Sequence, residues 1–205
     1  MMKVLLATNN AHKADEIRNA LDLPGWEFVT LREAGVDSDP AEDADSFTGN
    51  ARIKAWAAHE VSGGMPVLAD DSGLEVDALD GAPGVRSARF AGEDADDAAN
   101  NALLLSRLEG VPDAQRQARF VCTLVFVGEE GNEVCATGSV EGRIGHEAQG
   151  AGGFGYDPLF FPDEFGGAVS FAEVPQDEKS AISHRGCALR ELKKSLEEVY
   201  NLPMQ

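Results

Sequence analysis

The chain has 205 residues, 43% of them hydrophobic, which is enough for one domain over residues 1–205 with a sizeable core, or one domain folded as two lobes. Its 17 Lys and Arg against 36 Asp and Glu give a formal net charge of −19. That balance excludes non-specific binding to nucleic acid or anionic membranes, which needs basic patches. Three cysteines without a CxxC pair, and an N-terminal apolar stretch too short for a signal peptide or a membrane span, favour a reduced, cytoplasmic protein.

The first part of the chain alternates short apolar runs with helical patterns, which is typical of an α/β protein. Residues 3–7 predict a buried strand, and residues 27–31 predict a second one. Between them, residues 11–21 predict a helix with Asn10 as its N-cap.

A longer helix is expected to begin after Asp45 or Ser46 and to run through Val61. Apolar residues recur in it at helical spacing, which predicts a buried stripe consisting of Ile53, Trp56, Ala57 and Val61. Residues 66–69 then predict a strand that stops at the adjacent pair Asp70 and Asp71.

The second part of the chain contains a long apolar run at residues 118–128, which predicts a central strand covered on both faces. A turn at residues 129–132 leads into a partner strand at residues 133–140. The remaining expected elements are a helix capped by Asp94 that runs to Leu108, a short strand at 158–161, and a last helix at 184–200 with Leu189, Leu192, Leu196 and Val199 on its buried stripe.

The first candidate site lies where the first strand opens into the first helix. Its residues are Thr8, Asn9, Asn10, Ala11, His12 and Lys13. Free backbone N–H groups at a helix N-terminus, with a lysine one turn on, form an anion site. The alternative is an ordinary Asn10 cap with Lys13 on the surface.

The second candidate site is acidic. Asp70 and Asp71 repel each other unless a cation lies nearby, and adjacent aspartates suit a hard metal ion; the alternative is a solvated turn. The loop acids Glu42, Asp43 and Asp45 could add a metal ligand, although acids are also common at helix starts.

Two later segments complete the candidates. In the glycine-rich residues 152–158, Phe154 or Tyr156 could stack on a base, or both could be core aromatics in a tight turn. In residues 179–186, Lys179, His184 and Arg185 gather at a helix start, where the helix dipole disfavours cations. That arrangement favours an anionic or carbonyl-bearing ligand; the alternative is that Ser183 simply caps the last helix.

With these segments identified, the chain resembles the inosine/xanthosine triphosphate pyrophosphatase family from residue 3 to about residue 192. The matching motifs are Thr8-x-Asn10-x-x-Lys13, Glu42-x-x-x-Ser46-Phe47-x-x-Asn50-Ala51, Ala69-Asp70-Asp71-Ser72-Gly73-Leu74, Gly81-Ala82-Pro83-Gly84-Val85-x-Ser87-Ala88-Arg89, Gly153-Phe154-Gly155-Tyr156-Asp157-Pro158 and Lys179-x-Ala181-x-Ser183-His184-Arg185. Two departures stand out: Asn9 replaces a common glycine, and no Thr-Gly follows Glu42, so Asp43 or Asp45 could take its place as a ligand.

The resemblance implies an elongated mixed α/β fold with two lobes and a central active-site cleft, usually as a homodimer. It implies Mg²⁺-dependent cleavage of non-standard purine nucleoside triphosphates (ITP, dITP, XTP) to the monophosphate and pyrophosphate. Glu42 and Asp71 would bind Mg²⁺, and Asp71 would also accept the proton of the attacking water. The residues implied in substrate binding are Thr8, Asn9, Asn10, Ala11, His12 and Lys13 at the triphosphate, Ser72, and Phe154, Gly155, Tyr156, Asp157, Lys179, His184 and Arg185 around base and sugar.

Selectivity follows from hydrogen-bond chemistry. Hypoxanthine and xanthine carry a carbonyl where adenine carries an amino group, and Arg185 has donors only. Guanine shares this carbonyl and must be rejected elsewhere, for example by leaving its amino group without an acceptor. Three rival readings stay open: a pyrophosphatase for other nucleotides, such as modified pyrimidines; a nucleotide-binding regulator without catalysis; and a purely structural α/β module, which would leave the late cationic cluster unexplained.

Overall fold

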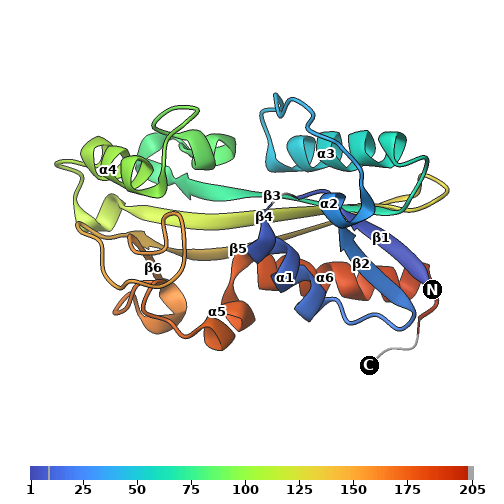
Figure 1. The fold of residues 1–205 in the computed structure, drawn as a ribbon. Coiled ribbons are helices and arrows are strands. Elements are labelled where there is room, and N and C mark those ends of the chain that lie inside the picture. The colour runs from blue at the N-terminus through green and yellow to red at the C-terminus, as the bar shows by residue number, and fades with distance from the viewer. Residues whose placement is uncertain (9, 203–205) are drawn as a thin grey trace. The chain divides into compact units, whose positions relative to one another are not determined.

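The computed structural model describes residues 1–8 and 10–202, without the side chains of His12 and Asp177. A six-stranded sheet has the order β2-β1-β3-β4-β5-β6 (Figure 1). Its strands are β1 (Met2–Leu6), β2 (Trp26–Thr30), β3 (Val67–Val76), β4 (Gln117–Val127), β5 (Glu133–Ile144) and β6 (Phe160–Pro162). Because β1 is parallel to β2 and β3 while β5 is antiparallel to β6, the sheet is mixed, and the predicted mixed α/β class is confirmed.

Helices connect these strands. They are α1 (Ala11–Ala20), α2 (Leu31–Ala34), α3 (Phe47–Val61), α4 (Asp97–Arg107), α5 (Gln176–Ile182) and α6 (His184–Val199). Short 3-10 turns lie at Asp77–Leu79, Gly84–Arg89, Asp113–Gln115 and Asp163–Phe165. No helix of the described chain combines the length and the apolar character needed to cross a membrane.

Backbone contacts divide the chain into two compact units. Unit 1 comprises Met1–Asp71, Cys122–Gly138 and Arg185–Gln205, and unit 2 comprises Ser72–Val121 and Ser139–His184. The borders fall inside β3, β4 and β5 and between His184 and Arg185, so consecutive residues of one element belong to different units.

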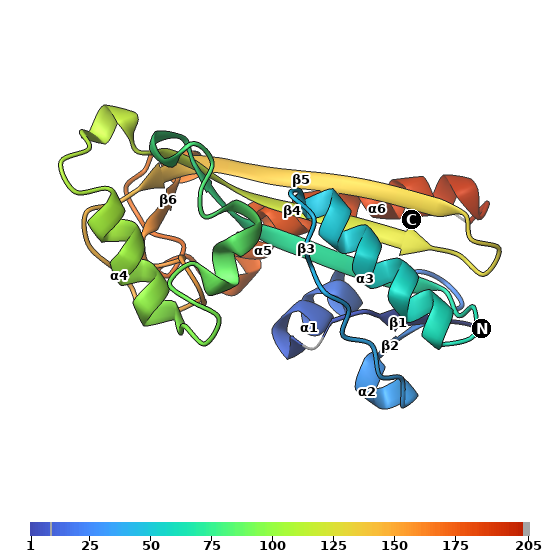
Figure 2. The same cartoon turned by 90° about the horizontal axis from the view of Figure 1, so that it is seen from above.

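In unit 1, side-chain alternation along the strands creates two buried layers. Val4 and Leu6 of β1 face α1 and α6, whereas Leu5 and Ala7 face α3. The two views agree that α3 covers one face of this part of the sheet and α1 and α6 cover the other (Figures 1 and 2). The first layer also contains Ala14, Ile17, Leu21, Leu68, Cys122, Leu124, Phe126, Leu189, Leu192 and Leu196; the second contains Ala51, Ala55, Ala58, Val67, Ala69, Val125 and Val127.

The predicted buried stripe of α3 is wrong. Trp56 and Val61 are 41% and 58% exposed, whereas Ala51, Ala55 and Ala58 are fully buried. Alanines let the helix lie close to the sheet, and hydrophobicity alone does not reveal a face built from small residues. The stripe of α6 is confirmed at its three leucines but is wrong at its last member, Val199, which is 52% exposed.

The predicted end of the third strand is also wrong. Strand β3 continues through Asp70 and Asp71 as far as Val76. Both aspartates are buried in the sheet, where cations from three helices contact them. The predicted cap of α4 is displaced as well: the Asp96 side chain, not that of Asp94, accepts from Ala99 N at 2.8 Å.

Unit 2 has its own core. Leu104 of α4 and Leu108, which caps the end of this helix, pack against Leu74, Val76, Ala118, Phe120, Val140, Ile144, Tyr156, Leu159, Phe160 and Phe171. The guanidinium of Arg116 is buried beside this core and donates to the carbonyl oxygens of Leu108, Ile144 and Gly145 at 2.7–2.9 Å. Burial lowers the pKa of Arg116, and these three carbonyls replace the water that it has lost.

Candidate active site

The two aspartates of β3 face opposite sides of the sheet because successive side chains of a strand alternate. Asp70 shares its side with Leu68 and therefore faces α1 and α6, while Asp71 shares its side with Ala69 and faces α3. Adjacent residues thus enter two different environments within unit 1.

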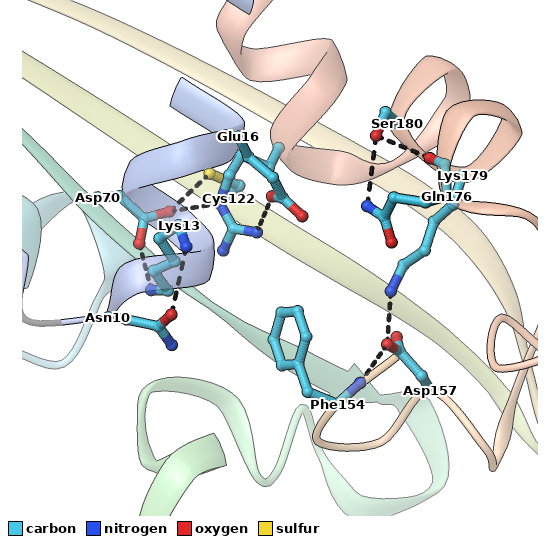
Figure 3. A network of polar contacts seen from close by, with 11 residues as sticks. Asn10, Lys13, Glu16, Asp70, Cys122, Phe154, Asp157, Gln176, Lys179 and Ser180 are labelled. Carbon is cyan, nitrogen blue, oxygen red and sulfur yellow. Dashed lines mark hydrogen bonds and ion pairs between the residues drawn. The ribbon is translucent and has the colours of Figure 1, made fainter. Parts of the chain in front are cut away.

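Asp70 is held by cations. Lys13 of α1 forms an ion pair with its Oδ1 (Figure 3). Arg185 Nε of α6 lies 3.2 Å from its Oδ2. The Cys122 thiol also donates to Oδ2, at 3.2 Å. Burial by itself would raise the pKa of Asp70, but the charges of Lys13, Arg185 and Lys54 outweigh it and lower that pKa well below the ordinary value. The ion pairs of Asp70 therefore favour its ionised form.

The start of α1 brings three predicted residues together. Asn10 Oδ1 accepts from Lys13 N at 3.2 Å, and Asn10 N donates to Thr8 Oγ1 at 3.1 Å. Asn10 is the predicted N-cap, and Lys13 points from this turn to Asp70 (Figure 3). Ala11 is exposed in the same turn. The predicted contributions of Asn9 and of the His12 side chain lie outside the described residues.

Arg185 forms ion pairs with two acidic residues. It is 3% exposed, and besides Asp70 it contacts Glu16 Oε2 at 2.7 Å through its NH1 group. Burial alone would lower the pKa of the guanidinium, but Asp70 and Glu16 raise it further above its ordinary value. Glu16 lies one helical turn after Lys13, so α1 supplies both a cation and an anion to this cluster.

On the opposite side of the sheet, Asp71 shares a lysine with the acidic loop. Lys54 Nζ of α3 lies 2.9 Å from Asp71 Oδ1 and 3.1 Å from Glu42 Oε2. Burial raises the pKa of Asp71; Lys54 opposes this shift, and Glu42 and Asp70 add to it. The Oδ2 atom of Asp71 is buried without a hydrogen-bond partner. A buried carboxylate with an unsatisfied oxygen suits a proton acceptor or a metal ligand.

The residues around Lys54 fit a divalent cation. Glu42 and Asp71 converge on one positive group, and Asp71 keeps an oxygen to spare. Among the described residues there is no group of three or more His, Cys, Asp or Glu side chains arranged around a common point. A magnesium ion bound here would therefore complete its shell with water and substrate oxygens, as Mg²⁺ usually does.

In unit 2, the glycine-rich segment forms a loop around Asp157. This carboxylate is 3% exposed, forms an ion pair with Lys179, and accepts from Phe154 N at 2.8 Å (Figure 3). Lys179 Nζ lies 5.2 Å from the centre of the Phe154 ring. A Cβ atom on Gly153, whose φ is +72°, would meet Asp157 Oδ2 at 2.1 Å. The absence of a side chain at Gly153 thus leaves room for the Asp157 carboxylate, and the contacts of this carboxylate organise the loop.

The two aromatic residues of this loop differ. Tyr156 is 4% exposed in the core of unit 2 and donates from its hydroxyl to Ser87 O at 2.8 Å, whereas Phe154 is 40% exposed. Burial raises the pKa of the Tyr156 phenol well above its ordinary value. Of the two rings, Phe154 is accessible for stacking.

The remaining predicted residues of unit 2 are less exposed than Phe154. His184 is 8% exposed and stacks on Phe120 with ring centres 5.0 Å apart. Ser72 is half-buried in β3, and Gly155 is half-buried next to Phe154.

Sequence reasoning missed five residues that contact these groups. They are Glu16, Lys54, Asp97, Asn101 and Cys122. A signal existed for Glu16, because it follows Lys13 at helical spacing. The others lie on elements whose contacts with the motifs depend on the tertiary fold.

Comparison with known proteins assigns the family. The family model described as "Ham1 family" matches residues 4–195. A dITP/XTP pyrophosphatase of Desulforamulus reducens is 50% identical over 97% of this chain and 98% of its own length, and one of Clostridium perfringens is 45% identical over 97% and 99%. Among solved structures, a HAM1 protein from Coxiella burnetii has a TM-score of 0.88 at 38% identity, covering 97% of this chain and 100% of its own.

Proposed function

Because this chain belongs to the Ham1 family, we propose that it is a pyrophosphatase that hydrolyses the non-standard purine nucleoside triphosphates dITP, XTP and ITP to the monophosphate and pyrophosphate. Its biological effect would be to remove these nucleotides from the pool. The proposal is supported by relatives that are named dITP/XTP pyrophosphatase and align over nearly the whole of both chains.

The observation that carries the chemistry is the pair of unlike carboxylates in β3. Asp70 is fixed as an anion by Lys13 and Arg185. Asp71 has a raised pKa and a buried oxygen without a partner. We therefore assign Asp71 as the acceptor of the proton that the attacking water loses, since its Oδ2 atom is buried and has no protein donor, which leaves it able to accept a proton.

We further propose that the reaction depends on Mg²⁺, with Glu42 and Asp71 as its protein ligands. When bound, the ion would stabilise the negative charge on the phosphate oxygens and on the leaving pyrophosphate. Lys54 brings a second positive charge to the same carboxylates, and the start of α1, with Lys13, offers N–H groups and an ammonium to the triphosphate. Asn9, Ala11 and His12 belong to this proposed phosphate site.

The base would be recognised by residues of the late motifs. Phe154 offers a stacking face with the Lys179 ammonium beside it. We propose that Arg185, oriented by Asp70 and Glu16, donates to the purine carbonyl that adenine lacks. The other residues in this proposal are Ser72, Gly155, Tyr156, Asp157 and His184.

The direct test measures pyrophosphate release from dITP with and without Mg²⁺, comparing wild type with Asp71→Asn. We expect Asp71→Asn to fold normally and to lose about 10²–10⁴ in kcat, the usual contribution of a general base. Asp163→Asn, which changes an exposed carboxylate of unit 2, is the matched control and should retain wild-type turnover. Near wild-type turnover by Asp71→Asn would remove Asp71 from the mechanism.

A substrate panel tests selectivity. Wild type should prefer ITP and XTP to ATP, and Arg185→Ala should reduce that preference, because the donor that distinguishes carbonyl from amine is lost. Modified pyrimidine triphosphates complete the panel. Turnover of those alone would assign another substrate class, and binding without pyrophosphate release would indicate a regulator.

We also propose a cytoplasmic homodimer. All three cysteines of the described chain are thiols, which suits a reducing compartment. Light scattering coupled to size-exclusion chromatography would test the dimer.

A further inference from the structure

The loop that carries Phe154 presents a single aromatic face. Phe154 is 40% exposed, whereas Tyr156 and Asp157 are 4% and 3% exposed. Under the proposed function this ring stacks on the purine, and stacking requires the ring plane to stand at a fixed position. Whatever fixes the loop therefore contributes to recognition of the base.

Helix α4 forms two hydrogen bonds with Gly155, the residue that follows Phe154. Asp97 Oδ2 accepts from Gly155 N at 2.7 Å, and Asn101 Nδ2 donates to Gly155 O at 2.9 Å. Asp97 and Asn101 are four residues apart, so they project from the same face of α4. Both polar atoms of Gly155 are thus bonded to one helix.

Gly155 has no side chain with which to anchor itself. Its φ of +61° lies in the left-handed region, and a Cβ built there would have no atom within 4 Å, so no side-chain packing at this position could hold it. Its neighbours are fixed by other means: Phe154 N bonds to Asp157, and the Tyr156 ring lies in the core. Without the hydrogen bonds to α4, the backbone at Gly155 would be free to rotate immediately after Phe154.

The side chain of Asn101 lowers the stability of the fold in one respect, and its bond to the Phe154 loop explains why an amide is nevertheless present. While its Nδ2 bonds to Gly155, its Oδ1 is buried without a partner. A buried unpaired acceptor destabilises the fold, and an apolar residue of similar shape would avoid that loss. The amide is therefore poorly explained by stability and well explained by its bond to the loop.

We propose that Asp97 and Asn101 are positioning residues that fix the plane of the Phe154 ring and thereby set the affinity for the purine base. This inference rests on the proposed function, because it takes the base as the partner of the ring. It predicts an effect on nucleotide binding and little effect on the chemical step, since neither residue is among the phosphate or proton-accepting groups.

The test uses Asn101→Leu, which has a similar shape and removes both the bond and the unpaired oxygen. We expect the KM for dITP and the Kd for deoxyinosine monophosphate to rise about tenfold, the range of one base–aromatic stack, with kcat within about twofold of wild type. Asp97→Asn should have a smaller effect in the same direction, because the hydrogen bond between Gly155 N and Asp97 Oδ2 is exposed to solvent. Amide hydrogen exchange at Gly155 should become faster in Asn101→Leu.

A double-mutant cycle with Phe154→Leu separates positioning from general stability. If Asn101 acts through the ring, the KM increases of Asn101→Leu and Phe154→Leu will not add. Asn100→Leu is the matched control: this amide lies on the same helix but bonds to Ala88 and Ala91, so its effect should add to that of Phe154→Leu.

The outcomes are distinct. Additive effects of Asn101→Leu and Phe154→Leu, or an unchanged KM in Asn101→Leu, would overturn the positioning role while leaving the enzyme assignment intact. A wild-type protein that releases no pyrophosphate from dITP, XTP or ITP would overturn the proposed function itself.

Discussion

Two neighbouring aspartates acquire different chemistry through nothing more than strand alternation. Asp70 faces Lys13 and Arg185, which lower its pKa, and Asp71 faces one lysine shared with Glu42, so that burial raises its pKa. The sheet thereby separates a carboxylate that organises cations from a carboxylate that can accept a proton.

A prediction follows for Asp70. Asp70→Asn leaves Lys13 and Arg185 beside a neutral group in a buried site, and removing one partner of a buried ion pair costs about 3–5 kcal/mol. We expect urea denaturation to reveal a lower free energy of unfolding of this order. Glu133→Gln, which changes the more exposed pair with Arg52, is the control and should hardly move the midpoint. Equal losses in the two variants would contradict a special role for the Asp70 cluster.

At the scale of elements, α3 shows how a helix of small residues packs. Ala51, Ala55 and Ala58 are fully buried, so the helix approaches the sheet too closely for larger side chains. This proximity brings Lys54, on the same helix, to Asp71 and Glu42.

Substitutions on two faces of α3 test this packing. Ala55→Leu should lower the free energy of unfolding by about 1–3 kcal/mol through overpacking. Ala57→Leu, on a half-buried position of the same helix, should change it by less than about 0.5 kcal/mol. Thermal or urea unfolding would measure both, and equal tolerance of leucine at the two positions would refute the close approach.

Most elements could be predicted from local patterns. The start of α3 at Ser46, the central strand β4 and the three buried leucines of α6 follow from capping and periodicity. The end of β3 could not be predicted, because a pair of acids inside a strand is stable only when distant lysines and arginine neutralise them.

The candidate site was predicted less completely than the fold. Motifs identified Lys13, Asp71 and Arg185, whereas Lys54 and Asn101 carry no local signal because their partners lie 17 and 54 residues away in the chain. A single sequence reveals residues with unusual local chemistry and leaves out those whose role comes from tertiary contacts.

At the scale of the whole molecule, the net charge of −19 shapes stability. Like charges over the surface repel one another and oppose the compact state, and dissolved salt screens that repulsion. We expect Tm to rise by about 2–4 °C between low salt and about 0.5 M sodium chloride, equivalent to about 1 kcal/mol for a chain of this size. Differential scanning calorimetry would measure it, and a Tm that falls with salt would mean that attractive pairs outweigh the repulsion.

The contact between Cys122 and Asp70 has a practical consequence. Burial and the adjacent carboxylate raise the pKa of this thiol well above its usual range, while Cys135 is exposed. An alkylating reagent should therefore modify Cys135 and the half-buried Cys187 in the native protein, and reach Cys122 only during transient opening. The rate of that slow modification reports, without an added probe, how often the interior beside Asp70 opens, and a nucleotide bound at Lys13 should reduce it.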